Sequence, residues 1–123
     1  MSISLDHTIV PARDKRRSAE FLAALLGLDV GAPFGPFVPV RVGASTLDYA
    51  DSTAADIESR HYAFRVSEPE FDEIFGRIRE AGLRYHANPH EPLRYGEINT
   101  ERGGRSVYFP DPDGHLLEIL TAG

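Results

Sequence analysis

Hydrophobic and polar positions follow the same order twice along the chain. Residues 3–10 alternate in the way a strand does, and the stretch after Asp14 then carries apolar residues at helical spacing up to Leu26. Asp14 is a typical N-cap, and Gly27 readily adopts the left-handed conformation that ends a helix. The first part of the chain therefore predicts a strand followed by an amphipathic helix.

The second part repeats this order. Residues 60–66 predict a strand, and Ser67 with Glu70 forms a capping box that starts a second amphipathic helix. Gly82 is placed to end that helix, as Gly27 ends the first. A second strand and helix are therefore expected.

The repetition keeps a constant offset. His61 minus His7 and Phe75 minus Phe21 both give 54 positions. A repeat with this period indicates two copies of one supersecondary unit.

Short extended segments separated by turn residues follow each helix. They cover 37–42 and 46–50 in the first half, and 107–109 and 116–121 in the second. The pattern predicts an α+β fold of two βαβββ modules, about 1–55 and about 56–123. Since a module of about 55 residues buries little surface alone, we expect the two to form one domain over 1–123, or to pair with modules of another chain.

Three polar side chains occupy unexpected places in the predicted strands. His7 alternates with apolar residues, His61 faces away from the expected helix layer, and Glu118 stands between two leucines. Singly, each has a structural interpretation: a hydrogen-bonded strand histidine, or a glutamate paired with Arg65 or Arg105. Together, two histidines at equivalent places and a carboxylate on the last strand predict a metal site with open coordination positions.

Two further residues are candidates for catalysis. Asp48 lies on the last strand of the first half, as Glu118 does in the second, and is either a fourth ligand, a catalytic carboxylate or a simple polar residue. Tyr108 is either a hydrogen-bond donor to the site or a packed strand aromatic. The chain has no cysteine, so imidazole and carboxylate groups are the available metal ligands.

The chain resembles the vicinal-oxygen-chelate superfamily, which includes glyoxalase I, fosfomycin-resistance glutathione transferases, bleomycin-resistance proteins and extradiol dioxygenases. The segments that carry the resemblance are LDHTIVPARDKRRSAEFLAALLGLDV, RHYAFRVSEPEFDEIFGRIREAGL and SVYFPDPDGHLLEIL. The second is closest to the fosfomycin-resistance enzymes, and the third is similar to the closing hairpin of the superfamily.

The resemblance implies both a site and a reaction type. It makes His7, His61 and Glu118 the ligands of one divalent ion (Mn, Fe, Ni or Zn) and places Asp48 near an additional carboxylate. It also implies a homodimer that shares its sites, and a metal that acts as a Lewis acid on a small oxygen-rich substrate. Lyase, isomerase, epoxide-opening transferase and dioxygenase chemistry all remain open. The alternative is a metal-free binding protein of the bleomycin-resistance kind that sequesters a small molecule.

The segment 87–105 is long for a connection and contains two prolines and three glycines. Such segments commonly form binding loops or solvated surface loops. Arg94, Tyr95 and Arg102, together with Arg65 on the predicted strand, are candidate substrate contacts.

The net charge of the chain limits the kinds of partner that we expect it to bind. A formal net charge of −6 argues against binding to a nucleic-acid backbone, which requires clustered cations. No apolar run is long enough to cross a bilayer, and the N-terminus has neither the order nor the length of a signal peptide. We therefore expect a cytoplasmic protein that acts on a small molecule.

Overall fold

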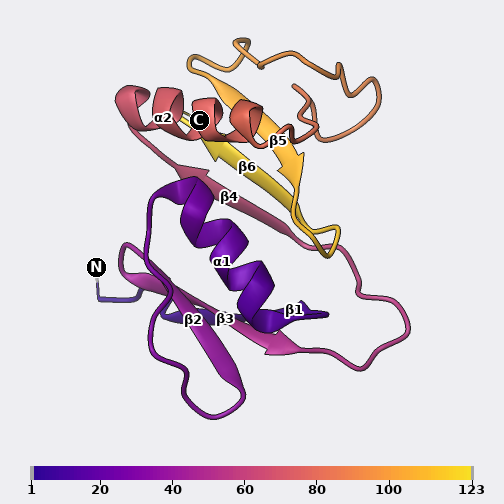
Figure 1. The fold of residues 1–123 in the computed structure, drawn as a ribbon. Coiled ribbons are helices and arrows are strands. Elements are labelled where there is room, and N and C mark those ends of the chain that lie inside the picture. The colour runs from indigo at the N-terminus through magenta and orange to yellow at the C-terminus, as the bar shows by residue number, and fades with distance from the viewer. Residues whose placement is uncertain (1, 123) are drawn as a thin grey trace. The chain divides into compact units, whose positions relative to one another are not determined.

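The computed structural model describes residues 2–122 and divides the chain into two compact units, 1–57 and 58–123. Each unit contains one helix and a three-stranded mixed sheet (Figure 1). This confirms the predicted α+β class. No helix within the described residues is long and apolar enough to span a membrane.

The first unit comprises β1 (His7–Ala12), α1 (Lys15–Leu26), β2 (Phe37–Val42) and β3 (Ser45–Asp51). The strand order is β1-β3-β2, with β3 parallel to β1 and antiparallel to β2. α1 packs against all three strands. The central strand β3 therefore has one face toward α1 and one face away from it.

The second unit repeats this topology with β4 (His61–Arg65), α2 (Glu68–Glu80), β5 (Ser106–Pro110) and β6 (Leu116–Leu120). The strand order is β4-β6-β5, with β6 parallel to β4 and antiparallel to β5. The last strand is again central. Both repeats therefore place the residues of their first and last strands side by side.

The first of the three strands expected after each helix is reduced to isolated bridges. In the first unit Val30 bridges Val40, and in the second His86 bridges Tyr108. The βαβββ plan is thus retained, with this strand too short to form a ladder. Its place in the second unit is taken by the long segment that leads to β5.

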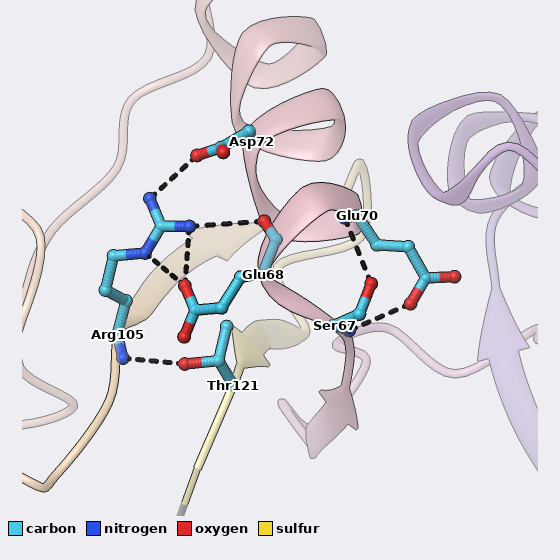
Figure 2. Close-up of polar contacts among 6 residues, drawn as sticks. All are labelled: Ser67, Glu68, Glu70, Asp72, Arg105 and Thr121. Carbon is cyan, nitrogen blue, oxygen red and sulfur yellow. Dashed lines mark hydrogen bonds and ion pairs between the residues drawn. The ribbon is translucent and has the colours of Figure 1, made fainter.

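The helix boundaries follow the predicted capping residues. The Asp14 carboxylate accepts a hydrogen bond from the Arg17 amide at 3.2 Å, and Gly27 has φ 73°. Ser67 and Glu70 form the reciprocal capping box at the start of α2, shown in Figure 2. Since each cap satisfies an otherwise unpaired amide, its contribution to stability is about 1 kcal/mol.

The first strand starts later than the sequence predicts. It covers 7–12 rather than 3–10, because β3 begins only at Ser45 and its contacts before His7 end with the Asp6 and Leu5 carbonyl oxygens. The apolar residues on the His7 side are exposed: Ile3 by 84%, Leu5 by 67% and Ile9 by 47%. These residues lie on the His7 side as expected, but that side is on the surface of the protein. The buried face of β1 carries Val10 and Ala12.

A polar clasp joins the start of α2 to the start of β5 (Figure 2). The Arg105 guanidinium pairs with the Glu68 carboxylate at 2.7 Å and with Asp72 at 2.8 Å. It also lies 4.3 Å from the centre of the Phe71 ring, and the Arg105 amide donates to the Thr121 hydroxyl at 2.9 Å. The clasp fixes the end of the long segment before β5 begins.

Candidate functional site

The open face of the second sheet carries the His61 and Glu118 side chains close together. Alternation along the strands turns Phe64, Leu117 and Ile119 into the core, so His61 and Glu118 point the other way. His61 Nε2 lies 3.1 Å from Glu118 Oε1. The Glu118 side chain is only 7% exposed and the His61 side chain 46% exposed, so the pair is buried at one end and accessible at the other.

A backbone contact orients the His61 ring. Its Nδ1 lies 3.0 Å from the Leu116 carbonyl oxygen, which can only accept a hydrogen bond, so Nδ1 carries a proton. Such a contact from the other ring nitrogen is the usual way in which proteins orient a metal-binding histidine. Nε2 is therefore the atom that His61 offers to a ligand.

The His61–Glu118 pair fits a metal ion. Two ligand atoms that are each about 2.0–2.2 Å from an ion and about 3 Å apart subtend about 90–100° at that ion, which is an ordinary ligand–metal–ligand angle. The 3.1 Å separation of Nε2 and Oε1 meets this condition without rearrangement. Imidazole and carboxylate suit first-row divalent metals.

Tyr108 adjoins this pair from the neighbouring strand. Tyr108 on β5 is directly opposite Glu118 on β6, and its ring stacks between those of His61 and His86. Arg102 donates to the Tyr108 hydroxyl at 3.1 Å. Burial raises the pKa of Tyr108 above 10.0; donation from Arg102 opposes this, and the Glu118 carboxylate adds to it.

The open face of the first sheet carries His7 and Asp48. Both line a cavity of about 580 Å³ that is also walled by Ile9, Phe34 and Phe37. Asp48 lies on the central strand β3 beside Ile9, two positions beyond the residue opposite His7. Hydrogen bonding to the neighbouring Asp6 raises the pKa of His7 from 6.5, and the charge of Asp48 adds to this effect.

Asp48 is a buried carboxylate with an unsatisfied atom. The residue is 4% exposed, and its Oδ1 has no hydrogen-bond partner among the residues that the structure describes. A buried acceptor without a donor costs free energy, and folded proteins retain such groups mainly where a ligand or ion completes them. Because Asp48 also lines the cavity, its carboxylate is a candidate acceptor for a metal or for a donor group of a substrate.

The candidate substrate contacts differ in how extensively they already pair with other residues. Arg94 pairs with Glu97 at 3.2 Å and with Glu101 at 2.7 Å, and these carboxylates hold it within its own loop. Arg102 is exposed apart from its bond to Tyr108.

Tyr95 and Arg65 occupy other positions around the second sheet. Tyr95 is half exposed, with its ring against His86 and the Arg84 guanidinium 4.0 Å from its centre. Arg65 is exposed at the end of β4.

The structure tests one predicted alternative for Glu118, an ion pair with Arg105. Pairing with Arg105 is wrong, because Arg105 is committed to Glu68 and Asp72 while Glu118 contacts His61.

The predicted ligands fall into two groups along the chain. His7 and Asp48 belong to the first unit, and His61 and Glu118 to the second. Among residues 2–122, no three histidine, aspartate or glutamate side chains gather as a group that could hold an ion. The two pairs are therefore each a partial ligand set.

His86 lies beside Tyr108, near the His61–Glu118 pair, and the sequence did not indicate this position. It is 7% exposed, its Nδ1 donates to the Asn88 carbonyl at 2.6 Å, and its ring is nearly parallel to that of Tyr108. The isolated bridge to Tyr108 places it there, and a single bridge has no periodic pattern in the sequence. No sequence signal could have found it.

With this geometry in view, the relationship to known proteins is clear. The family model of the Glyoxalase/Bleomycin resistance protein/Dioxygenase superfamily matches residues 4–119. This covers nearly the whole chain, and the protein belongs to that superfamily. The predicted resemblance is confirmed.

Three individual proteins illustrate the range of relatives. The structure of an oxidase, ChaP-H2, shares 57% sequence identity with a TM-score of 0.94, over 100% of this chain and 96% of that one. Glutathione transferase FosA of Serratia marcescens is 32% identical over 94% of this chain and 79% of its own length. Metallothiol transferase FosB of Shouchella clausii (strain KSM-K16) is 43% identical over 50% of this chain, a match that spans only 37% of the relative.

Proposed function

We propose that this protein is a metal-dependent enzyme that acts on a small oxygen-rich molecule. In this proposal His61, Glu118 and His7 hold one divalent ion, with His7 supplied by the same chain or by a second copy in a homodimer. Asp48 and Tyr108 are the accompanying catalytic groups. The substrate contacts are drawn from Arg102, Arg65, Arg94 and Tyr95.

One observation carries the proposal. His61 presents Nε2 beside a nearly buried Glu118 carboxylate, at a separation suited to two ligands of one ion. The Leu116 contact keeps a proton on Nδ1 and turns Nε2 toward Glu118, as in histidines that bind a metal through Nε2. A binding cleft without a metal would have no reason to bring these atoms together.

The ion and the surrounding side chains would have different roles at such a metal centre. When bound, the ion supplies electrophilic activation of a substrate oxygen. Asp48 lines the cavity, and its carboxylate would accept a proton or hydrogen bond from the substrate. Tyr108, whose raised pKa keeps it protonated at neutral pH, serves as a hydrogen-bond donor.

Among the reaction classes that the sequence leaves open, an oxidative one is favoured. The oxidase ChaP-H2 matches this chain over its full length at 57% identity, whereas the fosfomycin-resistance relatives match at lower identity or over half the chain. We therefore place oxidase or dioxygenase chemistry ahead of lyase, isomerase and transferase chemistry.

Elemental analysis of protein purified without chelator tests the proposal. We expect close to one equivalent of Mn, Fe, Ni or Zn per chain, and oxygen uptake by the iron-loaded protein with catechols as probe substrates. His61→Ala should lose the metal, whereas His90→Ala, which removes an exposed histidine, should keep it. A metal content below about a tenth of an equivalent, with no uptake on addition, contradicts the proposal.

The cavity of the first unit favours one rival function. Its wall combines Phe34 and Phe37 with three carboxylates, Asp6, Asp29 and Asp48, against one arginine. Aromatic rings and negative charge suit a planar or cationic compound. Sequestration of such a compound predicts tight binding by metal-free protein and no turnover, so calorimetry of the chelator-treated protein separates the two functions.

A further inference from the structure

The long segment before β5 reaches the Glu118 carboxylate through a single hydroxyl group. Arg102, near the end of that segment, donates from Nη1 to the Tyr108 hydroxyl oxygen at 3.1 Å. Tyr108 lies directly opposite Glu118 in the antiparallel β5–β6 ladder. A path of polar contacts therefore runs from an exposed arginine to a buried carboxylate.

The arginine determines the direction of the Tyr108 proton. Because a guanidinium can only donate, the hydroxyl oxygen is the acceptor and its own proton must point away from Arg102. The carboxylate facing it across the ladder is that of Glu118, which interacts with the Tyr108 hydroxyl. Glu118 is thus approached by His61 from one strand and by Tyr108 from another.

The neighbouring rings restrict the position of the Tyr108 ring. The residue is 2% exposed, and its ring is stacked with His86 at 6° and with His61 at 28° between planes. His86 is itself held by its bond to the Asn88 carbonyl. With the ring confined, the remaining variable is the hydroxyl rotor, and Arg102 fixes it.

We propose that Arg102 is a positioning residue, which holds Glu118 in its metal-binding orientation through the Tyr108 hydroxyl. This inference rests on the proposed metal function. Partners that orient a ligating carboxylate typically change metal affinity by about 10- to 100-fold when they are removed. The segment 87–105 would then regulate metal affinity in addition to contacting substrate.

Mn²⁺ affinity, measured from the EPR signal of the free ion, provides the main test. Tyr108→Phe should weaken binding by about 10- to 100-fold and Arg102→Gln by a smaller factor, with partial rescue in Arg102→Lys. In the Tyr108→Phe background, Arg102→Gln should cost nothing further, because the path is already broken. An equal cost of Arg102→Gln in both backgrounds, or a Tyr108→Phe affinity within twofold of the parent, overturns the inference.

Two matched variants control for the loss of a hydroxyl or a guanidinium. Tyr62→Phe removes a hydroxyl from the opposite side of β4, and Arg84→Gln removes an arginine that stacks on Tyr95. Both should leave Mn²⁺ affinity unchanged. Thermal unfolding of every variant shows whether any loss of affinity comes from loss of the fold.

A second measurement keeps the inference testable without metal. In metal-free protein, the ¹⁵N shift of His61 Nε2 reports its contact with Glu118, and it should change in Tyr108→Phe and in Arg102→Gln but not in Tyr62→Phe. If the parent protein binds no metal, the proposed function fails whatever this shift does. If the parent binds metal but neither variant alters the shift, the positioning role fails alone.

Discussion

The two units place an acid and a histidine at matching points of their sheets. Only in the second unit are these two side chains in contact. Asp48 and Glu118 each lie on a central strand two positions beyond the residue paired with the histidine. Glu118 contacts His61 at 3.1 Å, whereas Asp48 Oδ1 has no hydrogen-bond partner among the described residues. Equal register therefore does not produce equal sites.

Side-chain length and the opposing strand account for the difference. Glutamate has one more methylene group than aspartate with which to reach its neighbours. Opposite Glu118 lies Tyr108, which brings a hydroxyl, while opposite Asp48 lies Pro39, which has no donor. The second unit thus carries a preassembled pair, and the first unit carries an acceptor that a ligand must complete.

The largest expected effect concerns the proposed metal ligands. Removing the imidazole in His61→Ala should weaken Mn²⁺ or Zn²⁺ binding by about 100-fold or more, because losing an atom that binds the metal costs more affinity than losing a group that orients a ligand. The fold should survive, since the His61 side chain is 46% exposed. Calorimetric titration measures the loss, and retained affinity would remove His61 from the site.

Neutralising the two acids should affect stability with opposite sign. In metal-free protein, Asp48→Asn removes a buried charge whose Oδ1 has no hydrogen-bond partner among the described residues, and it should raise the midpoint of thermal unfolding by about 2–6 °C. Glu118→Gln removes the negative charge beside His61 and should lower the midpoint by a similar amount. The same sign for both variants would refute the contrast between the units.

The attachment of each helix start to its sheet offers a weaker comparison. In the first unit the Asp51 carboxylate accepts from the Lys15 amide at 2.9 Å, whereas in the second Arg105 spans two carboxylates and an aromatic ring. Arg105→Gln should lower the unfolding midpoint by about 2–5 °C. Arg16→Gln, which breaks one exposed helical pair with Glu20, should change it by less than about 2 °C.

The smallest expected effect lies in the turn before β6. Burial raises the pKa of Asp111 above 3.8, although amide donation from His115 and Asp113 opposes this. The folded state therefore binds this proton more tightly than the unfolded chain, and that contribution to stability is lost as the pH rises from 3.8 through the raised pKa.

Asp111→Asn keeps the Oδ1 acceptor and removes the charge. The variant should gain about 2–4 °C over the parent near neutral pH, and the gain should shrink on acidification. Unfolding curves between about pH 4 and about pH 8 measure this, and a gain that grows on acidification would be the wrong sign.

The sequence predicts the elements and their faces well, because capping residues and alternation act locally. Ser67, Asp14 and Gly27 set helix ends that the structure confirms. The placement of Glu118 beside His61 also follows from alternation and the repeat. The late start of β1 and the role of His86 depend on which distant residues offer partners, and local patterns carry no record of that.

The roles of the loop arginines could not be separated from sequence either. Arg94 and Arg102 have the same charge and lie eight positions apart in one polar segment. In the structure Arg94 is neutralised by Glu97 and Glu101, whereas Arg102 contacts Tyr108. Such pairing depends on the backbone path of a segment without periodic structure.

Anomalous diffraction from crystals soaked with Zn²⁺ tests the central claim most directly. A metal centre built on His61 and Glu118 predicts a single strong peak at about 2.0–2.2 Å from His61 Nε2 and from a Glu118 oxygen, with His7 Nε2 as a further ligand. Full occupancy of a peak elsewhere on the surface, with the His61–Glu118 contact intact and vacant, would contradict it.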